Sequence, residues 1–240
     1  MVARYNGDPM DWPRIPWAEF VKTLGWKQGE HLMTIGETGS GKTTLISKLV
    51  PLRKYAVVFV TKTYDKSFHK SKWPGFTVMR EWDRRKAAEL QHVLLWPEAG
   101  KTIRETVENQ RRVFDEALNE IYRERGWCIV IDELQWVVDQ LKFDMEMRTY
   151  QHQARSSGIT IVSGFQRPSH VPVVTYGSAT HAFISRQSED GDVKRLAALG
   201  GIDAEKLRAA LPLIRKHDWL YVGRAATTGA ILTRVDMKAG

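Results

Sequence analysis

Residues 36–43 read GETGSGKT and match G-x-x-x-x-G-K-[ST], the pattern of a loop that binds nucleotide phosphates. The apolar segment 32–35 precedes this loop, and apolar residues at helical spacing within 45–50 follow it. A strand, a glycine-rich turn and a helix in this order direct backbone N–H groups and the positive end of the helix dipole at bound phosphates. The other interpretation, a surface turn before an ordinary helix, is disfavoured by the apolar segments on both sides.

The motif gives each residue of the loop an expected role. Lys42 is expected to reach the β- and γ-phosphate oxygens, and the Thr43 hydroxyl is expected to ligate Mg²⁺. The residues expected to contact the nucleotide are Gly36, Glu37, Thr38, Gly39, Ser40, Gly41, Lys42, Thr43 and Thr44.

A second motif is the acidic pair at the end of an apolar run in WCIVIDELQW. Asp132 and Glu133 would lie at the carboxyl end of a strand, where open α/β sheets bind their ligands. Asp132 suits the outer sphere of Mg²⁺, and Glu133 is placed to accept a proton from attacking water. A base for water favours hydrolysis of ATP over phosphoryl transfer to a small acceptor, and the chain lacks the N-K-x-D motif of switch GTPases. The alternative is a solvated acidic turn.

The third motif is an apolar strand that ends in a polar cluster, within QARSSGITIVSGFQRPSHVP. In a parallel sheet this strand can lie beside both the strand of the phosphate loop and the strand of Asp132. Its carboxyl end would then hold Gln166 near the γ-phosphate, where an amide can hydrogen-bond phosphate or the attacking water. The alternative for Gln166 is a polar cap at the strand end.

Apolar and amphipathic segments alternate along the chain, which predicts an α/β fold with a mostly parallel sheet flanked by helices. Strands are predicted at 32–35, 56–61, 92–96, 128–131, 159–163 and 182–185, and helices at 103–121, 144–156 and 204–210. The segment WLYVGRAATTGAILTRV predicts a C-terminal β-hairpin with its turn at Thr227, Thr228 and Gly229. We expect one P-loop ATPase domain over 30–240 and an N-terminal arm, 1–29, packed on it.

Composition sets broader limits. The 240 residues carry a formal charge of +8, which permits a polyanionic partner. Cys128 is the only cysteine, which excludes a disulfide framework, and its apolar neighbours predict burial in a strand. There is no apolar run of about 18 residues, so we expect no membrane segment and a cytoplasmic protein.

The three motifs in this order resemble the FtsK/HerA superfamily of ring-forming DNA translocases, in which an Arg-x-x-Gly-Ile segment leads into a strand that ends in Gln-Arg-Pro. The likeness extends to THAFISRQSEDGDVKRLAALGG and spans about 29–222. It implies a RecA-like (ASCE) P-loop NTPase with ATP and Mg²⁺ as cofactors and Gln166 as sensor. It also implies that Arg155 is an arginine finger for a neighbouring subunit, with Arg148 and Arg186 as rivals. A solvent-facing arginine at a helix end is the other interpretation of Arg155, and Ala154 stands where many relatives have glycine.

We therefore expect an ATP-hydrolysing translocase of double-stranded DNA, a minimal motor domain of the kind that packages viral genomes. It would act as a homo-oligomeric ring, a pentamer or hexamer, with a portal or procapsid protein as a further partner, in the host cytoplasm if viral. The alternative is an ATPase that drives protein assembly, secretion or conjugative coupling. A third interpretation, a monomeric nucleotide kinase, would need an acceptor lid, which the sequence does not resemble.

Two aromatic segments carry less specific expectations. The stretch TKTYDKSFHKSKWPGF places basic residues among aromatic ones, which fits either a loop that tracks DNA or a solvated loop whose rings dock on the core. Its residues are Lys62, Tyr64, Lys66, Phe68, Lys70, Lys72 and Trp73. In the N-terminal arm, Trp12, Trp17 and Trp26 are expected to pack on the domain, with a shelf for adenine as the alternative.

Overall fold

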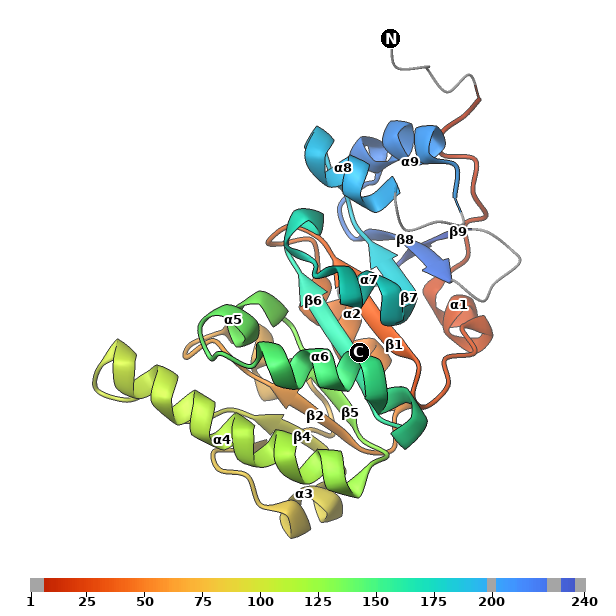
Figure 1. The fold of residues 1–240 in the computed structure, drawn as a ribbon. Helices are drawn as coiled ribbons and strands as arrows, with labels where there is room; N and C mark the ends of the chain where they lie inside the picture. The colour runs from red at the N-terminus through yellow and green to blue at the C-terminus, as the bar shows by residue number, and fades with distance from the viewer. Residues whose placement is uncertain (1–6, 198–201, 224–229, 236–240) are drawn as a thin grey trace.

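The computed structural model describes residues 7–197, 202–223 and 230–235. Its strands form one sheet in the order β3-β4-β2-β5-β6-β1-β7-β8-β9 (Figure 1). The pairs from β3 to β7 are parallel, and β8 and β9 add an antiparallel edge. This confirms the predicted α/β class with its C-terminal hairpin. The predicted hairpin turn at 227–229 lies outside the described residues.

The strands are β1 His31–Ile35, β2 Ala56–Phe59, β3 Thr77–Met79, β4 His92–Leu95, β5 Cys128–Ile131, β6 Thr160–Phe165, β7 Ala179–Ile184, β8 Asp218–Gly223 and β9 Ala230–Arg234. All six strands predicted from apolar runs are present. β6 extends two residues beyond its predicted end and β7 begins three residues earlier, because partners in the sheet and not apolarity fix where pairing stops. The three-residue edge strand β3 was not predicted, since two of its residues are exposed and leave no apolar run.

The helices are α1 Trp17–Thr23, α2 Lys42–Leu49, α3 Arg84–Leu90, α4 Ile103–Glu124, α5 Leu134–Asp139, α6 Asp144–Gln153, α7 Val173–Ser178, α8 Asp190–Ala197 and α9 Ala204–Ala210. The three predicted helices correspond to α4, α6 and α9. The last predicted turn of α6 is a 3₁₀ helix, Ala154–Ser157, which ends at Gly158 with a φ of +64°. None of the described helices is long and apolar enough to cross a membrane.

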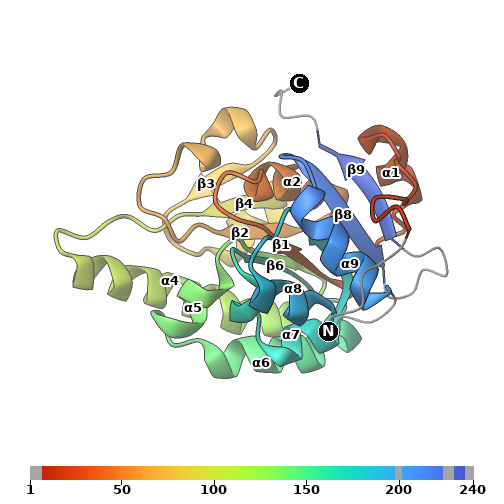
Figure 2. The same cartoon turned by 90° about the horizontal axis from the view of Figure 1, so that it is seen from above.

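The sheet lies between two layers of helices (Figure 2). Successive side chains of each strand face opposite sides, so the sheet separates two apolar layers. On β5, Ile129 and Ile131 face the layer of α4 to α9, whereas Cys128 and Val130 face the layer of α1 and α2. Cys128 is fully buried, and burial raises the pKa of its thiol to about 12. The predicted burial of this cysteine is confirmed.

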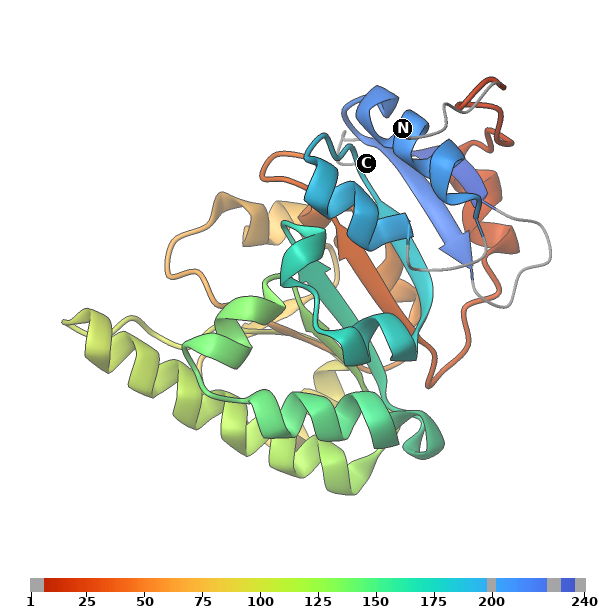
Figure 3. The ribbon, with the colours of Figure 1, turned by 45° about the horizontal axis from the view of Figure 1, so that its top comes forward.

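The strand order places β6 between β1 and β5. Leu32 pairs in parallel with Val162 on one side of β6, and Val130 pairs with the same residue on the other. Figure 3 shows β1 and β6 side by side with their arrowheads at one edge of the sheet. The carboxyl ends of β1, β5 and β6 therefore meet at that edge, which we call the carboxyl edge.

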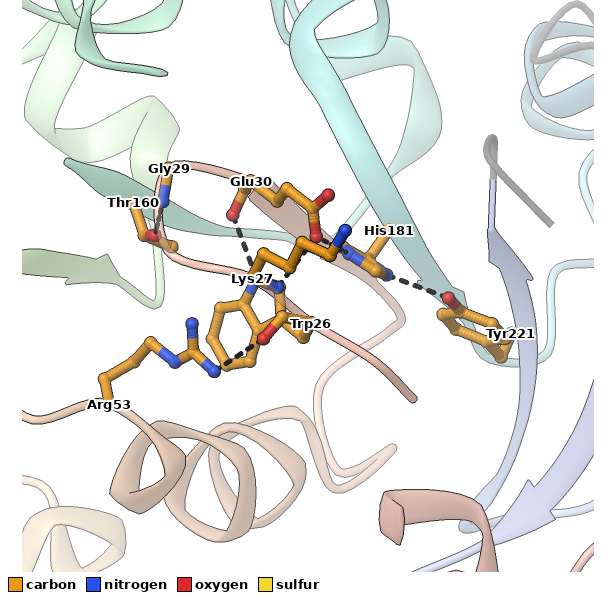
Figure 4. Close-up of polar contacts among 8 residues, drawn as sticks. All are labelled: Trp26, Lys27, Gly29, Glu30, Arg53, Thr160, His181 and Tyr221. Atoms are coloured by element: carbon orange, nitrogen blue, oxygen red, sulfur yellow. Dashed lines mark hydrogen bonds and ion pairs between the residues drawn. The ribbon is translucent and has the colours of Figure 1, made fainter. Parts of the chain in front are cut away.

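The opposite end of these strands, the amino edge, is closed by a polar network that ties the segment before β1 to three other strands (Figure 4). The Gly29 N–H donates to the Thr160 hydroxyl at 2.9 Å. Glu30 lies 3.1 Å from Nε2 of His181, whose Nδ1 lies 2.8 Å from the Tyr221 hydroxyl. These contacts tie the segment that leads into β1 to β6, β7 and β8.

The N-terminal arm lies against the hairpin and the amino edge. Ile15 donates its N–H to the carbonyl of Leu232 on β9 at 3.0 Å. Trp26 is buried, its indole N–H donates to the Glu30 carbonyl, and the Arg53 guanidinium stacks 4.3 Å from its ring centre. Trp26 therefore packs on the core at the amino edge, away from the phosphate loop, as the packing interpretation expects.

Candidate active site

The phosphate loop links β1 to α2, and three of its positions require glycine for steric reasons. A Cβ on Gly36 would lie 2.7 Å from the Ser40 hydroxyl and 2.9 Å from Cβ of Ser185. Gly39 and Gly41 have φ values of +83° and +96°, a conformation that other residues rarely adopt. Helix α2 begins directly after Gly41, so its first N–H groups open onto the loop.

Lys42 lies folded back over the loop. Its ammonium donates to the Gly36 carbonyl at 2.6 Å, and only 9% of the residue is exposed. Burial lowers the pKa of Lys42, whereas the neighbouring carboxylates of Asp132 and Glu133 raise it. A phosphate group offers this ammonium a stronger, charged acceptor than a carbonyl does.

The side chains of Thr43 and Asp132 contact each other next to the phosphate loop. The Thr43 hydroxyl donates to Oδ2 of Asp132 at 2.8 Å, while Oδ1 of Asp132 is buried and has no hydrogen-bond partner among the described residues. Burial raises the pKa of Asp132, and Lys42 and the Thr43 hydroxyl act in the opposite direction. A hydroxyl and a carboxylate with a free buried oxygen fit Mg²⁺, which prefers oxygen ligands and keeps most of its coordination for phosphate and water.

Glu133 and Gln166 are joined directly. The side-chain amide of Gln166, which follows β6, donates to Oε2 of Glu133, which follows β5, at 2.7 Å. The two residues come from neighbouring strands, so the parallel pairing of β5 and β6 brings them together. Lys42, Asp132, Glu133 and Gln166 therefore occupy one site at the carboxyl edge.

Gly164 makes the contact between the ends of β5 and β6 possible. A Cβ at this position would lie 2.1 Å from the Asp132 carbonyl oxygen. The two backbones can approach this closely only because Gly164 has no side chain. We did not predict this role from the sequence, although a glycine inside an apolar strand is a recognised sign of close backbone approach.

Arg167 fixes the segment that follows Gln166. Its guanidinium donates to the buried carboxylate of Asp192 at 3.0 Å and also pairs with Glu189. Asp192 accepts a further hydrogen bond from the Ser169 N–H at 3.0 Å. The start of α8 therefore holds the Gln-Arg-Pro segment in place. The spacing of these residues along the chain gives no sign of this contact.

Lys62 contributes to the electrostatics of the site. It follows β2, and its positive charge lowers the pKa of Asp132 and of Lys42. A cavity of about 790 Å³ is lined by Lys62 and Glu133. It lies between three elements: the segment after β2, the start of α4, and α5. Lys62 and Tyr64 line it together with Trp136.

The basic and aromatic segment after β2 divides into two parts. Phe68 and Trp73 are 2% and 1% exposed and stack on each other, so these rings dock on the core. Tyr64 is 92% exposed, and Lys66 and Lys72 of the same segment are also exposed. Of the two expectations for this segment, docking of the rings holds for Phe68 and Trp73. The side chain of Lys70 lies outside the described residues.

The three candidate finger arginines lie in different places, and all are exposed. Arg155 is at the amino edge, where its carbonyl approaches Gly29, and its guanidinium acts together with burial to lower the pKa of His31 to about 4. Arg148 pairs with Asp144 at 2.8 Å within α6. Arg186 follows β7 at the carboxyl edge, next to Ser185, whose N–H donates to the Ile35 carbonyl. The structure therefore does not bring Arg155 to the nucleotide site of its own chain.

No family model and no curated protein sequence matches this chain. The genome-packaging NTPase B204 of Sulfolobus turreted icosahedral virus 2, solved with sulfate, aligns with a TM-score of 0.62 and 14% identity over 89% of this chain and 100% of that chain. VirB4 of Thermoanaerobacter pseudethanolicus aligns with a TM-score of 0.62 and 10% identity over 87% and 89%. The pCW3 conjugation coupling protein TcpA, solved with ATPγS, aligns with a TM-score of 0.54 and 16% identity over 90% and 61%.

These structures define the class of fold. This chain shares their fold, the α/β fold of P-loop ATPases that was predicted from its motifs. At these identities the likeness concerns the fold, and the chain spans all of B204 but about three fifths of TcpA.

Replacing Gly164 with alanine tests the close approach of β6 to β5. The added Cβ meets backbone atoms of Asp132, which cannot turn aside, so we expect a loss of about 2–3 kcal/mol in the free energy of unfolding. Gly177→Ala in α7 is the matched control, because its Cβ would have no neighbour within 4 Å and alanine favours helix. Denaturant unfolding measures both, and equal stability of the two variants would contradict this role of Gly164.

Proposed function

We propose that this protein hydrolyses ATP at the carboxyl edge of its sheet and uses the reaction to translocate double-stranded DNA, as a genome-packaging motor built from a ring of identical copies. The observation that carries the hydrolytic part is the 2.7 Å hydrogen bond between Gln166 and Glu133. This pair lies beside the phosphate loop and Asp132. A carboxylate that can accept a proton from water and an amide would therefore both be next to the phosphates that the loop would bind.

Each residue of the site has a distinct task in this proposal. Lys42 would exchange the Gly36 carbonyl for phosphate oxygens. Thr43 and Asp132 would hold Mg²⁺, which would supply positive charge to the bound phosphates. Oε2 of Glu133 is engaged by Gln166, which leaves its other carboxylate oxygen to accept a proton from water. The Gln166 amide can also donate to the γ-phosphate, which would couple the position of Glu133 to the state of the nucleotide.

Three observations favour DNA as the client. The chain has a net charge of +8, and the exposed residues Lys62, Lys66 and Lys72 stand with Tyr64 on one segment at the rim of the site. Basic side chains around an exposed ring fit contact with a nucleic-acid backbone. B204 is named a genome-packaging NTPase, and the alignment with this chain covers the full length of B204. A portal or procapsid protein would be the partner that receives the DNA.

The place of Arg155 supports the proposed ring. The six residues of β6 separate it from the carboxyl edge by about 20 Å, beyond the reach of one side chain. A phosphate that Arg155 contacts would therefore belong to another copy. Arg148 already has a carboxylate partner within α6, and Arg186 lies on the side of its own phosphate loop, so Arg155 is the first candidate for a finger in trans.

A second candidate function is favoured by the names of other neighbours. TcpA is named a conjugation coupling protein and EccC of Thermomonospora curvata a type VII secretion ATPase, and both share the fold. An ATPase that drives protein export or coupling would use the same nucleotide site and a different client.

ATP hydrolysis measured against protein concentration, with and without duplex DNA, separates the two functions. For a translocating ring we expect a rate per copy that rises with concentration, increases with duplex DNA and falls steeply with added salt, because phosphate contacts release counterions. Hydrolysis that is indifferent to DNA at every salt concentration would contradict translocation and favour the protein-export alternative.

Glu133→Gln should separate binding from chemistry. We expect the rate of ATP hydrolysis to fall by at least about 100-fold, because the amide cannot accept a proton, while ATP affinity changes little. Lys42→Ala should instead weaken ATP binding. Glu108→Gln, the same change at an exposed position on α4, is the control. Steady-state kinetics and nucleotide titration measure both quantities, and full activity of Glu133→Gln would remove it from the role of base.

Arg155→Ala should suppress turnover by about 10³-fold and leave nucleotide binding intact. Mixing this variant with Glu133→Gln should restore part of the activity, because an Arg155→Ala copy keeps its own acid and receives the arginine of a Glu133→Gln neighbour. Arg111→Ala, at an exposed position on α4, is the control. Loss of binding equal to the loss of turnover, or no recovery on mixing, would count against a finger in trans.

A further inference from the structure

The phosphate loop is contacted by a residue from the far end of the chain. His217, in the segment before β8, places its Nδ1 3.2 Å from the carbonyl oxygen of Ser40, 177 positions earlier in the sequence. A carbonyl oxygen only accepts hydrogen bonds, so Nδ1 carries the hydrogen and His217 donates. This contact is not explained by any of the three motifs.

The contact fixes the orientation of one peptide group in the loop. In a trans peptide the C=O and the following N–H point in opposite directions. When His217 holds the Ser40 carbonyl outward, the Gly41 N–H is directed to the other face of the loop, where a phosphate would bind. Among the described residues, the Gly41 N–H has no acceptor, so it is available to an anion.

The peptide group between Ser40 and Gly41 turns by rotation about ψ of Ser40 and φ of Gly41. Gly41 has a φ of +96°, and glycine crosses between backbone regions at little cost, so an external contact is needed to fix this peptide group. The Ser40 side chain does not anchor it, since its hydroxyl is buried without a hydrogen-bond partner in the described part of the chain. The His217 contact therefore decides which way this peptide faces.

His217 is itself held in an uncommon conformation. Its φ is +69°, in the left-handed region that residues other than glycine seldom occupy. The next residue, Asp218, is buried and accepts hydrogen bonds from Arg14 of the N-terminal arm and Arg234 of β9, at 3.5 Å and 3.2 Å. The arm and the hairpin thus keep His217 against the phosphate loop at the cost of local strain.

We infer that His217 is a positioning residue for nucleotide binding: by holding the Ser40 carbonyl it aims the Gly41 N–H at the nucleotide phosphates. The inference rests on the nucleotide-binding part of the proposed function. It also makes phosphate affinity depend on the packing of the C-terminal hairpin, which lies outside the three motifs.

Three substitutions separate the hydrogen bond from the backbone conformation. His217→Gly removes the donor and relieves the left-handed strain, so it should not destabilise the fold through the backbone. His217→Asn tolerates the left-handed region and offers an amide N–H near the position of Nδ1. Lys216→Gly, at the exposed neighbouring position, controls for added flexibility in this segment.

The measurements are dissociation constants for ADP and ATP, kcat at saturating ATP, and thermal unfolding without nucleotide. We expect His217→Gly to bind both nucleotides about fivefold to tenfold more weakly, the effect of one lost hydrogen bond, with kcat unchanged within about twofold. His217→Asn and Lys216→Gly should bind within about twofold of the unaltered protein.

Three results would overturn the inference alone, in a protein that otherwise binds nucleotide. The first is unchanged affinity in His217→Gly, and the second is an affinity in His217→Asn as weak as that of His217→Gly. The third is a matching loss in thermal stability, because the effect would then be on the fold. An unaltered protein that binds neither ADP nor ATP would overturn both this inference and the proposed function.

Discussion

The insertion of β6 between β1 and β5 is the constraint on which the site depends. Neighbouring strands lie about 4.8 Å apart, so three parallel strands in this order deliver the phosphate loop, the acidic pair and Gln166 within about 10 Å of one another. The hydrogen bond between Gln166 and Glu133 and the hydrogen bond between Thr43 and Asp132 both span this junction. Gly164 permits it, because any side chain there would meet the Asp132 backbone.

Charged groups gather at this junction in a partly buried space. Lys42 lies near the carboxylates of Asp132 and Glu133, and burial acts against the charged forms of Lys42 and Asp132. Lys62 also acts on this site, although its ion-pair partner is Asp65, at 3.4 Å. A bound triphosphate would add several negative charges, which a cation would partly neutralise. The unpartnered oxygen of Asp132 beside the Thr43 hydroxyl is where such a cation would find protein ligands.

The site is held in shape by residues that come late in the chain. Asp192 on α8 fixes Arg167 and hence the segment after Gln166, and His217 before β8 fixes a peptide group of the phosphate loop. Both contacts act on backbone or on a neighbouring side chain rather than on the nucleotide itself. The C-terminal third of the fold therefore sets the geometry of groups that the earlier strands supply.

The sequence by itself determined the strand–loop–helix of the phosphate loop, the acidic pair, the α/β class and the hairpin, because each depends on local spacing and on alternation of apolar segments. It also suggested that Gln166 would lie near the γ-phosphate, since strands of a parallel sheet end at one edge. Only the tertiary structure decided that Phe68 and Trp73 are buried, that Arg155 lies at the amino edge, and that Gly164, Asp192 and His217 support the site. Those outcomes depend on contacts between residues up to 177 positions apart, which are fixed by strand order and packing and leave no periodic pattern in the chain.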